Sequence, residues 1–288
     1  MDRLAPEQVC VVTGANRGLG KATATALARH GGRVLLLCRS ASNGEHAADD
    51  ILRATGNDRL EVVQVDLASF ASIRAAASSI LARHQRLHLL VNNAGVNLPD
   101  RRLSADGLEM TLAVNHLAPF LLTRLLLPAL HRGGARGRAA RVVTVASLFE
   151  RFGRIRIDDL QGARRYSGLA AYAQSKLANV LFTRALATRL DGAVTATCAD
   201  PGLAATDLLR DHLYYRIGVL RGLWQRFLLT PESGARAAVI AGTSPALEGV
   251  SGECISRRGR VIRTSRRSRD RALAERLWTM SEELTAER

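Results

Sequence analysis

The chain has 288 residues, of which 47% are hydrophobic and 23% are charged. These proportions are typical of a folded globular protein and exclude a disordered, collagen-like or coiled-coil protein. Lysine and arginine together number 41 against 26 acidic residues, so the formal net charge is +15. Such an excess of positive charge is compatible with an anionic small molecule, a nucleic acid or a membrane surface as partner.

The positive charge comes almost entirely from arginine, because Lys21 and Lys176 are the only lysines. Eight arginines lie between Arg257 and Arg271, where Asp270 is the single acidic residue. We interpret this stretch as a solvated basic rim near the C-terminus, and we expect no specific nucleic-acid partner. A peripheral contact with a membrane is left open.

The four cysteines show neither metal-ligand spacing nor a disulfide framework, so we expect no metal site and a reducing compartment. They are Cys10, Cys38, Cys198 and Cys254. The first residues contain no apolar segment of signal-peptide length. The most apolar stretch, residues 116–130, contains Arg124 and Pro128 and is shorter than the roughly 20 residues of a membrane-spanning helix. We therefore expect a cytoplasmic protein, which would be membrane-associated if a longer natural form carried an N-terminal anchor.

Six short β-rich runs alternate with stretches of helical length that are rich in alanine and leucine. The runs are residues 9–14, 33–39, 60–66, 87–95, 141–147 and 193–202. Each is continuously apolar, which indicates strands buried on both faces of a parallel sheet. The pattern predicts a single-domain α/β fold over residues 1–288, with a Rossmann-type doubly wound parallel sheet flanked by helices. We expect a core at 8–256, a substrate lid at 203–229, and a basic stretch with a last helix at 257–288.

The first predicted strand runs into a glycine-rich turn that precedes a helix-like segment. The turn contains Gly14, Gly18 and Gly20, together with Asn16, Arg17 and Leu19. Glycines at this position give a tight turn, let the backbone approach a pyrophosphate and direct a helix N-terminus at its charge. The spacing differs from the general dinucleotide fingerprint, so a purely structural turn is the alternative at this point.

The second predicted strand ends in Arg39, at the position where a fold that binds NAD carries an acidic residue for the adenosine ribose. A positive charge there attracts a 2′-phosphate, and Arg17 adds a second one. We therefore favour NADP(H) over NAD(H) as the cofactor. The alternative is that Arg39 is an ordinary surface charge in an arginine-rich protein.

Two further strand ends carry residues that are predicted to line the same cofactor. These residues are Asp66 and Leu67 after the third strand, and Asn93, Ala94 and Gly95 after the fourth. The Asp66 carboxylate is suited to accept a hydrogen bond from the adenine amino group. Each could be an ordinary strand-end turn, but both together favour a cofactor site.

Tyr172 and Lys176 lie four residues apart in a helix-like segment, so their side chains are predicted to share one face within about 6 Å. A phenol is a poor base at neutral pH because its reference pKa is about 10. A neighbouring ammonium, helped by the positive nicotinamide of an oxidised cofactor, favours the phenolate and makes the pair an acid/base group. Ser147 is predicted to hydrogen-bond the substrate oxygen. Asn115 is predicted to hold a water that relays the proton.

In order and spacing, these motifs resemble those of the classical short-chain dehydrogenase/reductase family over about residues 8–256. Residues 106–128, 171–190, 247–252 and 276–284 are similar to its retinol dehydrogenase branch. The resemblance implies that Tyr172 is the acid/base, that Ser147 stabilises the substrate, and that Lys176 binds the nicotinamide ribose. It also implies a proton relay at Asn115 and cofactor contacts from Tyr172, Pro201, Gly202 and Thr206, with Thr206 near the carboxamide.

Two positions depart from the pattern of that branch. Asp200 stands where the branch usually has histidine, and Cys254 with Ile255 stands where it usually has tyrosine and phenylalanine. Both positions are expected near the substrate side or the edge of the sheet. They therefore bear on the identity of the substrate and leave the cofactor and the catalytic set unchanged.

The segment 203–229 contains four aromatic residues, Tyr214, Tyr215, Trp224 and Phe227. An aromatic lid suits a lipophilic substrate such as a retinoid, a steroid or a long-chain aldehyde, while a packed lid or a homodimer contact is the alternative. We therefore expect an NADP(H)-dependent oxidoreductase that interconverts a lipophilic alcohol and its aldehyde or ketone. The alternative function is a catalytically silent dinucleotide-binding regulator that holds an acidic partner with its arginine-rich stretch.

Overall fold

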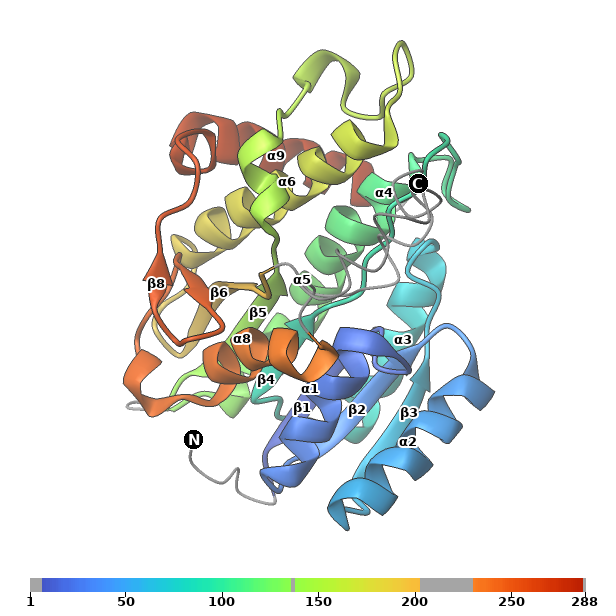
Figure 1. The fold of residues 1–288 in the computed structure, drawn as a ribbon, viewed down its shortest axis with the longest axis vertical. Coiled ribbons are helices and arrows are strands. Elements are labelled where there is room, and N and C mark those ends of the chain that lie inside the picture. The colour runs from blue at the N-terminus through green and yellow to red at the C-terminus, as the bar shows by residue number, and fades with distance from the viewer. Residues whose placement is uncertain (1–6, 136–137, 203–229, 287–288) are drawn as a thin grey trace, which may run out of the picture.

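The apolar runs of the sequence form one eight-stranded sheet in a computed structural model, which describes residues 7–135, 138–202 and 230–286 (Figure 1). The strands are β1 (Val9–Thr13), β2 (Arg33–Cys38), β3 (Leu60–Gln64), β4 (Leu89–Asn92), β5 (Ala140–Val145), β6 (Val194–Asp200), β7 (Cys254–Ser256) and β8 (Val261–Ile262). Their spatial order is β3-β2-β1-β4-β5-β6-β7-β8. All neighbouring strands are parallel except β8, which is antiparallel to β7.

The chain reverses its direction of progress across the sheet between β1 and β4. In open parallel sheets, ligands bind outside the carboxyl ends of the strands at this switch point. We therefore expect the site residues to lie at the carboxyl ends of β1, β4, β5 and β6.

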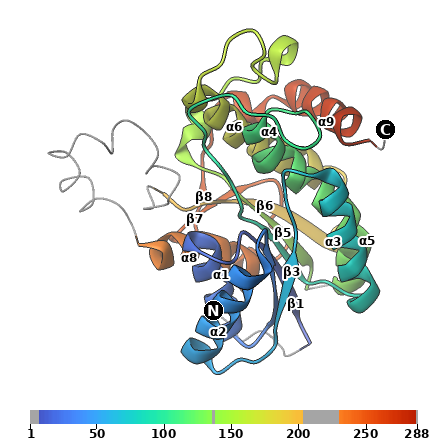
Figure 2. The ribbon, with the colours of Figure 1, turned by 90° about the vertical axis from the view of Figure 1, so that its right-hand side faces the viewer.

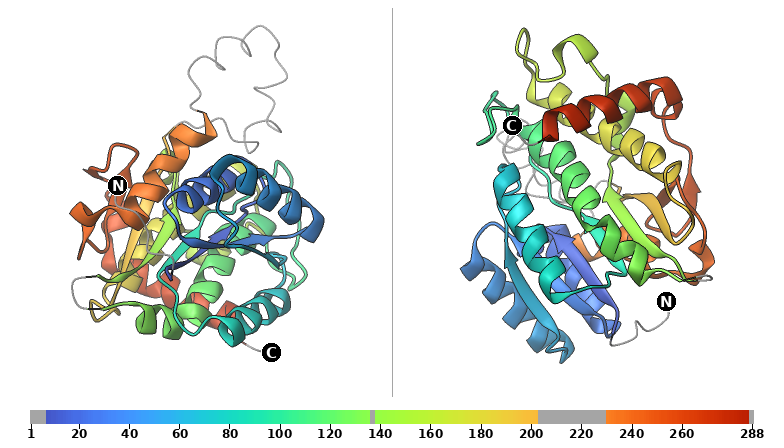
Figure 3. Two further views of the ribbon diagram at one scale, coloured as in Figure 1. Left: turned by 90° about the horizontal axis from the view of Figure 1, so that it is seen from below. Right: turned by 180° about the vertical axis from the view of Figure 1, so that it is seen from behind.

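Helices cover both faces of the sheet (Figure 2). One layer contains α1 (Gly18–Arg29), α2 (Ala41–Thr55) and α8 (Pro231–Thr243), and the other contains α3 (Phe70–Arg83), α5 (Ala118–Gly133) and α6 (Gly168–Ala187). The last helix, α9 (Arg271–Thr285), packs on the outside of α6, as the view from behind shows for the red and yellow helices (Figure 3).

Alternate residues of the central strands face opposite helical layers. On β1, Val11 joins the core formed with α3, α5 and α6, whereas Cys10 and Val12 join the core formed with α1, α2 and α8. All three side chains are fully buried. Burial on both faces explains why the strands read as continuous apolar runs in the sequence.

The predicted fold class is confirmed, although the bounds of several strands differ from the prediction. The fourth strand is Leu89–Asn92 and not 87–95, because residues 93–95 leave the sheet and turn toward β1. The third strand ends at Gln64, before Asp66. The sequence analysis missed β7 and β8, which have only three and two residues and so carry little periodic signal.

The helical run Met110–Gly133 is the one segment of the described chain that is long and apolar enough to span a membrane by length and composition. This run is longer than the apolar stretch noted in the sequence. It is 78% buried within the domain over its most apolar window, as is typical of a core helix of a globular protein.

Candidate active site

The glycine-rich turn after β1 takes a backbone conformation that requires glycine at two positions. Gly14 has φ +66° and Gly18 has φ +52°, in the left-handed region that favours glycine. Gly20 is required for space, because a Cβ there would lie 2.2 Å from the Gly14 carbonyl oxygen. Leu19 and Gly20 are buried, whereas Asn16 is half-buried.

The helix that follows this turn begins without a side-chain cap. The N-cap residue of α1 is Arg17, whose side chain makes no capping hydrogen bond, and the first turn contains no acidic residue. By contrast, Ser40 caps α2 and Ser69 caps α3 through their hydroxyl oxygens. Main-chain N–H groups in the first turn of a helix have no partner within the helix, so this terminus is suited to an anion.

The end of β4 is fastened to the end of β1 through Thr13. The Thr13 hydroxyl accepts hydrogen bonds from the main-chain N–H groups of Asn93 (2.9 Å) and Ala94 (3.0 Å). The Asn93 amide donates to the Thr13 carbonyl oxygen at 2.8 Å. These bonds hold the loop at residues 93–95 beside the glycine turn, and the sequence analysis did not single out Thr13.

The residues that are predicted to bind the adenosine half of the cofactor lie just after the ends of β2 and β3. Arg39 is exposed directly after β2, where no carboxylate accompanies it on the strand. The Asp66 carboxylate accepts a hydrogen bond of 2.9 Å from the Ala68 N–H, and Leu67 packs against the main core. The structure thus brings these residues to the same edge of the sheet as the glycine turn.

Tyr172 and Lys176 project from the same face of α6, as their spacing predicts. The Lys176 ammonium nitrogen lies 5.6 Å from the centroid of the Tyr172 ring, and it donates a hydrogen bond of 3.0 Å to the Val145 carbonyl oxygen at the end of β5. Ser147 follows two residues later and caps the short 3-10 helix Leu148–Phe152. The three side chains therefore converge where β5 meets α6.

Burial dominates the protonation behaviour of this pair. Burial raises the pKa of Tyr172 to about 12, the Asp200 carboxylate also raises it, and a hydrogen bond with Ser147 lowers it. Burial lowers the pKa of Lys176 to about 8, against the opposing influence of Cys198 and Asp200. The protein's own groups thus keep the phenol protonated at neutral pH, and the expected lowering of its pKa does not arise from Lys176 alone.

Asn115 lies in a π-helical turn, Ala113–Leu117, between the short helix α4 (Met110–Leu112) and α5. Its side-chain oxygen accepts from the Val96 N–H at 2.7 Å. Its amide donates to the Val96 carbonyl oxygen at 2.9 Å and to the Ser175 hydroxyl at 3.0 Å. Asn115 therefore clamps the loop after β4 against α6, and π-turns of this kind occur frequently at functional sites.

Ser175 is a buried member of the site that the sequence analysis missed. Its hydroxyl donates to the Tyr172 carbonyl oxygen at 2.8 Å and accepts from the Asn115 amide. A signal was present, because Ser175 is a polar residue directly before Lys176 on a helix whose neighbouring positions are buried. Close packing continues at Gly95, where a Cβ would lie 3.3 Å from the Asn115 side-chain oxygen and 3.8 Å from the Lys176 ammonium.

Asp200 ends β6, and its carboxylate accepts a hydrogen bond of 2.9 Å from the Gly202 N–H. Pro201 is buried and Gly202 is half-buried. Asp200 also lines a small cavity together with Ser147, Cys254 and Arg263. Thr206 and the expected lid at 203–229 lie outside the described residues.

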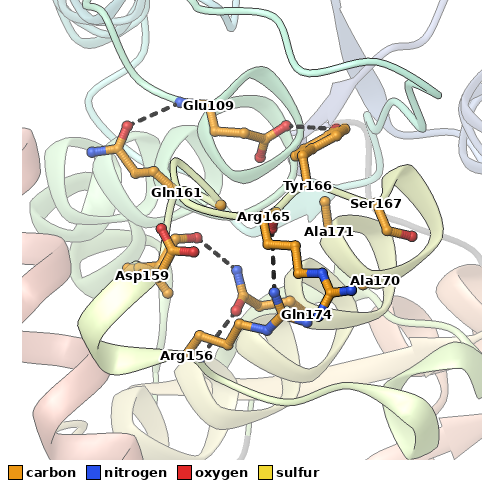
Figure 4. A pocket seen from close by; sticks show the side chains of 12 residues that line it. Glu109, Arg156, Asp159, Gln161, Arg165, Tyr166, Ser167, Ala170, Ala171 and Gln174 are labelled. Atoms are coloured by element: carbon orange, nitrogen blue, oxygen red, sulfur yellow. Dashed lines mark hydrogen bonds between the residues drawn. The ribbon is translucent and has the colours of Figure 1, made fainter.

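A second pocket lies beside the N-terminal end of α6 (Figure 4). There the Tyr166 hydroxyl donates to the Glu109 carboxylate at 3.1 Å, and the Gln161 side-chain oxygen accepts from the Glu109 N–H at 3.2 Å. Glu109 in turn caps α4 through the N–H groups of Thr111 and Leu112. These hydrogen bonds around the pocket hold the loop before α6 in place. None of the described catalytic residues lines this pocket.

In residues 7–135, 138–202 and 230–286, no group of three His, Cys, Asp or Glu side chains is arranged to hold a metal ion. The described site contains a glycine turn at a helix N-terminus and a Ser-Tyr-Lys cluster on the adjoining strand and helix. A Rossmann-type sheet with these features defines a nucleotide-binding oxidoreductase. The sequence model described as short chain dehydrogenase matches residues 8–213, and the chain belongs to this family.

Two curated relatives cover nearly the whole chain. Retinol dehydrogenase 11 of Mus musculus is 42% identical over 280 residues, which are 96% of this chain and 85% of the relative. Polyprenol dehydrogenase of Mus musculus is 42% identical over 283 residues, which are 97% of this chain and 84% of the relative. The predicted resemblance to the retinol dehydrogenase branch is confirmed.

Solved structures share the fold. An uncharacterized protein from Mycobacterium paratuberculosis has a TM-score of 0.77 and 35% identity, covering 96% of this chain and 93% of that one. A 3-ketoacyl-(acyl-carrier-protein) reductase from Brucella melitensis, complexed with NADH, has a TM-score of 0.67 and 26% identity over 86% and 96% of the two chains. RhlG from Pseudomonas aeruginosa, complexed with NADP, has a TM-score of 0.69 and 25% identity over 88% and 97%.

Proposed function

We propose that this chain is an NADP(H)-dependent oxidoreductase that interconverts a lipophilic alcohol and its aldehyde or ketone, with Tyr172 as the acid/base. The observation that carries the proposal is the convergence of Ser147, Tyr172 and Lys176 where β5 meets α6, directly beside Gly95 and the glycine turn. These groups make a proton donor, a hydrogen-bond donor for an oxygen and a fixed positive charge.

The residues fit a nicotinamide dinucleotide. A pyrophosphate can approach the main chain of the glycine turn, because Gly14, Gly18 and Gly20 have no side chains. The start of α1, which lacks a side-chain cap, also suits its negative charge. Other residues proposed to hold the cofactor are Asn16, Arg17, Leu19, Arg39, Asp66, Leu67, Asn93, Ala94, Gly95, Tyr172, Lys176, Pro201, Gly202 and Thr206. The Asn93 side-chain oxygen is buried and has no hydrogen-bond partner among the described residues, so it retains the capacity to accept a hydrogen bond at this strand end. When bound, this cofactor supplies or accepts the hydride.

Charge supports NADP(H) over NAD(H). Arg39 lies exposed at the end of β2, where a carboxylate would favour a free ribose diol, and Arg17 lies in the adjoining turn. Ser40, the next residue, caps α2 and adds no negative charge. The cofactors of the solved relatives include both NADH and NADP, so the preference rests on Arg39 and Arg17.

The proton chemistry follows from the raised pKa of Tyr172. A phenol that stays protonated at neutral pH donates its proton to the substrate oxygen as a carbonyl is reduced, while the Ser147 hydroxyl hydrogen-bonds the same oxygen. In the reverse direction, Tyr172 must lose its proton first, which the Lys176 ammonium and an oxidised nicotinamide favour. A water relay at Asn115 would use the main chain or the second lone pair of its side-chain oxygen, because both amide hydrogens are already donated.

A lipophilic substrate is supported by the side chains that follow Ser147 and by the relatives. Phe149 packs edge-on against the Tyr172 ring, with the centroids 5.6 Å apart, so one wall of the reacting centre is aromatic. Two relatives are named for retinol and polyprenol, which are both lipophilic alcohols. The alternative of a silent regulator is not favoured, because every predicted catalytic side chain in the described chain is present and converges.

The test is a panel of retinoids, steroids and long-chain aldehydes with NADPH and, separately, NADH, followed at the absorbance of the cofactor. We expect turnover of at least one lipophilic carbonyl compound, with a higher kcat/KM for NADPH. Short polar aldehydes of equal reactivity serve as the control for substrate class. No turnover of any carbonyl compound with either cofactor would contradict the proposed activity.

A further inference from the structure

The arginine-rich stretch near the C-terminus forms one surface with the 3-10 helix that follows Ser147. Figure 1 shows residues 257–271 running along the edge of the domain from the turn between β7 and β8 to the start of α9. The Arg151 guanidinium donates to the Arg263 carbonyl oxygen at 2.9 Å, and that of Arg267 donates to the Gly153 carbonyl oxygen at 3.3 Å. We call residues 148–154 and 257–271 the basic face.

The positive charge of the basic face is not neutralised by the rest of the described chain. The face contains ten arginines and two acidic residues. Glu150 is buried and accepts hydrogen bonds from the N–H and hydroxyl of Ser265, and Asp270 caps α9. None of the ten arginines forms an ion pair with another described residue. The face therefore presents a concentrated positive field to solvent.

Apolar side chains are exposed among these arginines. Phe152 is 72% exposed, Val261 is 52% exposed and Leu148 is 40% exposed. They are three of the six large hydrophobic residues that are exposed in the described chain, although the basic face is a small part of its sequence. Single exposed apolar residues are ordinary, but their concentration in a strongly basic surface indicates a partner that is both anionic and apolar.

We propose that the basic face docks the protein on the surface of an anionic lipid bilayer. Arginines at headgroup level and a few apolar side chains below them are the combination that binds a peripheral protein to such a surface. A nucleic acid offers the charge but no apolar layer for Val261 and Leu148, so it is the less suitable partner. Docking through this face does not depend on catalysis.

The basic face adjoins the proposed active site, so docking affects how substrate reaches that site. This consequence rests on the proposed function. Leu148, Arg151 and Arg263 line the same cavity as Ser147 and Asp200. A protein bound through this face holds that cavity toward the bilayer, where a lipophilic alcohol or aldehyde partitions. Substrate would then reach the Ser147 side of the site without crossing bulk water.

The test compares the wild-type protein with two charge-reversal variants in vesicle sedimentation, using phosphatidylcholine alone or with phosphatidylserine. Arg258→Glu/Arg260→Glu changes two exposed arginines of the basic face. Arg29→Glu/Arg86→Glu makes the same change in net charge at two exposed positions elsewhere, the last residue of α1 and the loop after α3. We expect wild-type binding only to phosphatidylserine vesicles, weakening with salt. The first variant should partition at least about 25-fold more weakly, and the matched control within about threefold of wild type.

Phe152→Ser separates the apolar contribution from the charge. We expect severalfold weaker binding to phosphatidylserine vesicles with an unchanged salt dependence, because no charge is altered. Equal losses in the two charge-reversal pairs would overturn the proposal, since binding would then follow net charge only. Binding to duplex DNA but not to the vesicles, with the same loss in Arg258→Glu/Arg260→Glu, would also overturn it in favour of a nucleic acid. Sedimentation measures binding and requires no turnover. The docking proposal can therefore be tested even if the proposed activity fails.

Discussion

The Lys176 ammonium donates a hydrogen bond of 3.0 Å to the carbonyl oxygen of Val145. Val145 is the last residue of β5, so this bond fixes the catalytic helix to the strand that leads to Ser147. The same ammonium lies 5.6 Å from the centroid of the Tyr172 ring. One buried lysine thus links the strand that leads to Ser147 with the helix that carries Tyr172.

The burial of Lys176 predicts an alkaline limit for carbonyl reduction. Burial lowers the pKa of this ammonium to about 8, so its positive charge is lost as the pH rises through that value. We expect kcat/KM for NADPH to fall above about pH 8, because this parameter reports the groups of the free enzyme. Lys176→Arg cannot lose its charge in this range, and its residual activity should stay flat. A wild-type profile that remains level well above pH 8 would remove Lys176 from the assigned role.

Asp200 is expected to bias the site toward proton donation. Burial is the largest cause of the raised pKa of Tyr172, and the Asp200 carboxylate raises it further. Asp200→Asn removes that negative charge, so the pKa of Tyr172 falls and alcohol oxidation, which needs the phenolate, reaches its full rate at lower pH. The matched control is Asp200→Glu, which keeps the charge. Superimposable pH profiles of kcat for the Asn variant and the wild type would show that Asp200 has no such influence.

Arg39 is expected to control cofactor choice. Arg39→Asp replaces an attraction for a 2′-phosphate with a repulsion and supplies a carboxylate suited to a free ribose diol. We expect kcat/KM for NADPH to fall about ten- to a hundredfold, with that for NADH unchanged or improved. Arg17→Ala should shift the ratio in the same direction by less. The effect should shrink at high salt, and an unchanged ratio in Arg39→Asp would make Arg39 a plain surface charge.

His116 predicts a loss of stability in mild acid. It is buried against Phe120 and Phe182, and burial lowers its pKa to about 4 from an ordinary value of 6.5. The unfolded chain therefore binds a proton on His116 between these values and the folded chain does not. The resulting stability, about 3 kcal/mol, is present above pH 6.5 and is lost as the pH falls toward 4.

Urea unfolding at neutral and mildly acidic pH measures this contribution. His116→Gln removes the titrating ring but retains an amide group for Ser281, whose hydroxyl lies 2.9 Å from the imidazole Nε2. The variant should lose less free energy of unfolding between the two pH values than the wild type does. Equal pH dependence in the two proteins would show that His116 is not the acid-sensitive group.

Much of the fold and site could be predicted because the signals were local. Continuous apolar runs mark β1, β2 and β5, and the fixed offset between Tyr172 and Lys176 places both on one helical face. The role of Thr13 as a bridge between β1 and β4 depends on a contact some 80 residues away in sequence, which no local pattern encodes. The π-turn at Asn115 likewise arises only when α4, α5 and α6 pack together, and the Phe149 ring that packs on Tyr172 comes from the separate 3-10 helix after β5.

The role of Tyr172 as proton donor is tested most directly by comparing the kcat of Tyr172→Phe with the kcat of Tyr166→Phe. Both changes remove a phenol hydroxyl, but the single O–H of Tyr166 points at Glu109 and the Leu98 carbonyl oxygen, outside the reacting centre. With NADPH and a lipophilic aldehyde, Tyr172→Phe should lose activity by about 10²- to 10⁴-fold while binding NADPH within about twofold of the wild type. Tyr166→Phe should remain within about tenfold in kcat. Retained turnover in Tyr172→Phe would contradict the assignment of Tyr172 as the proton donor.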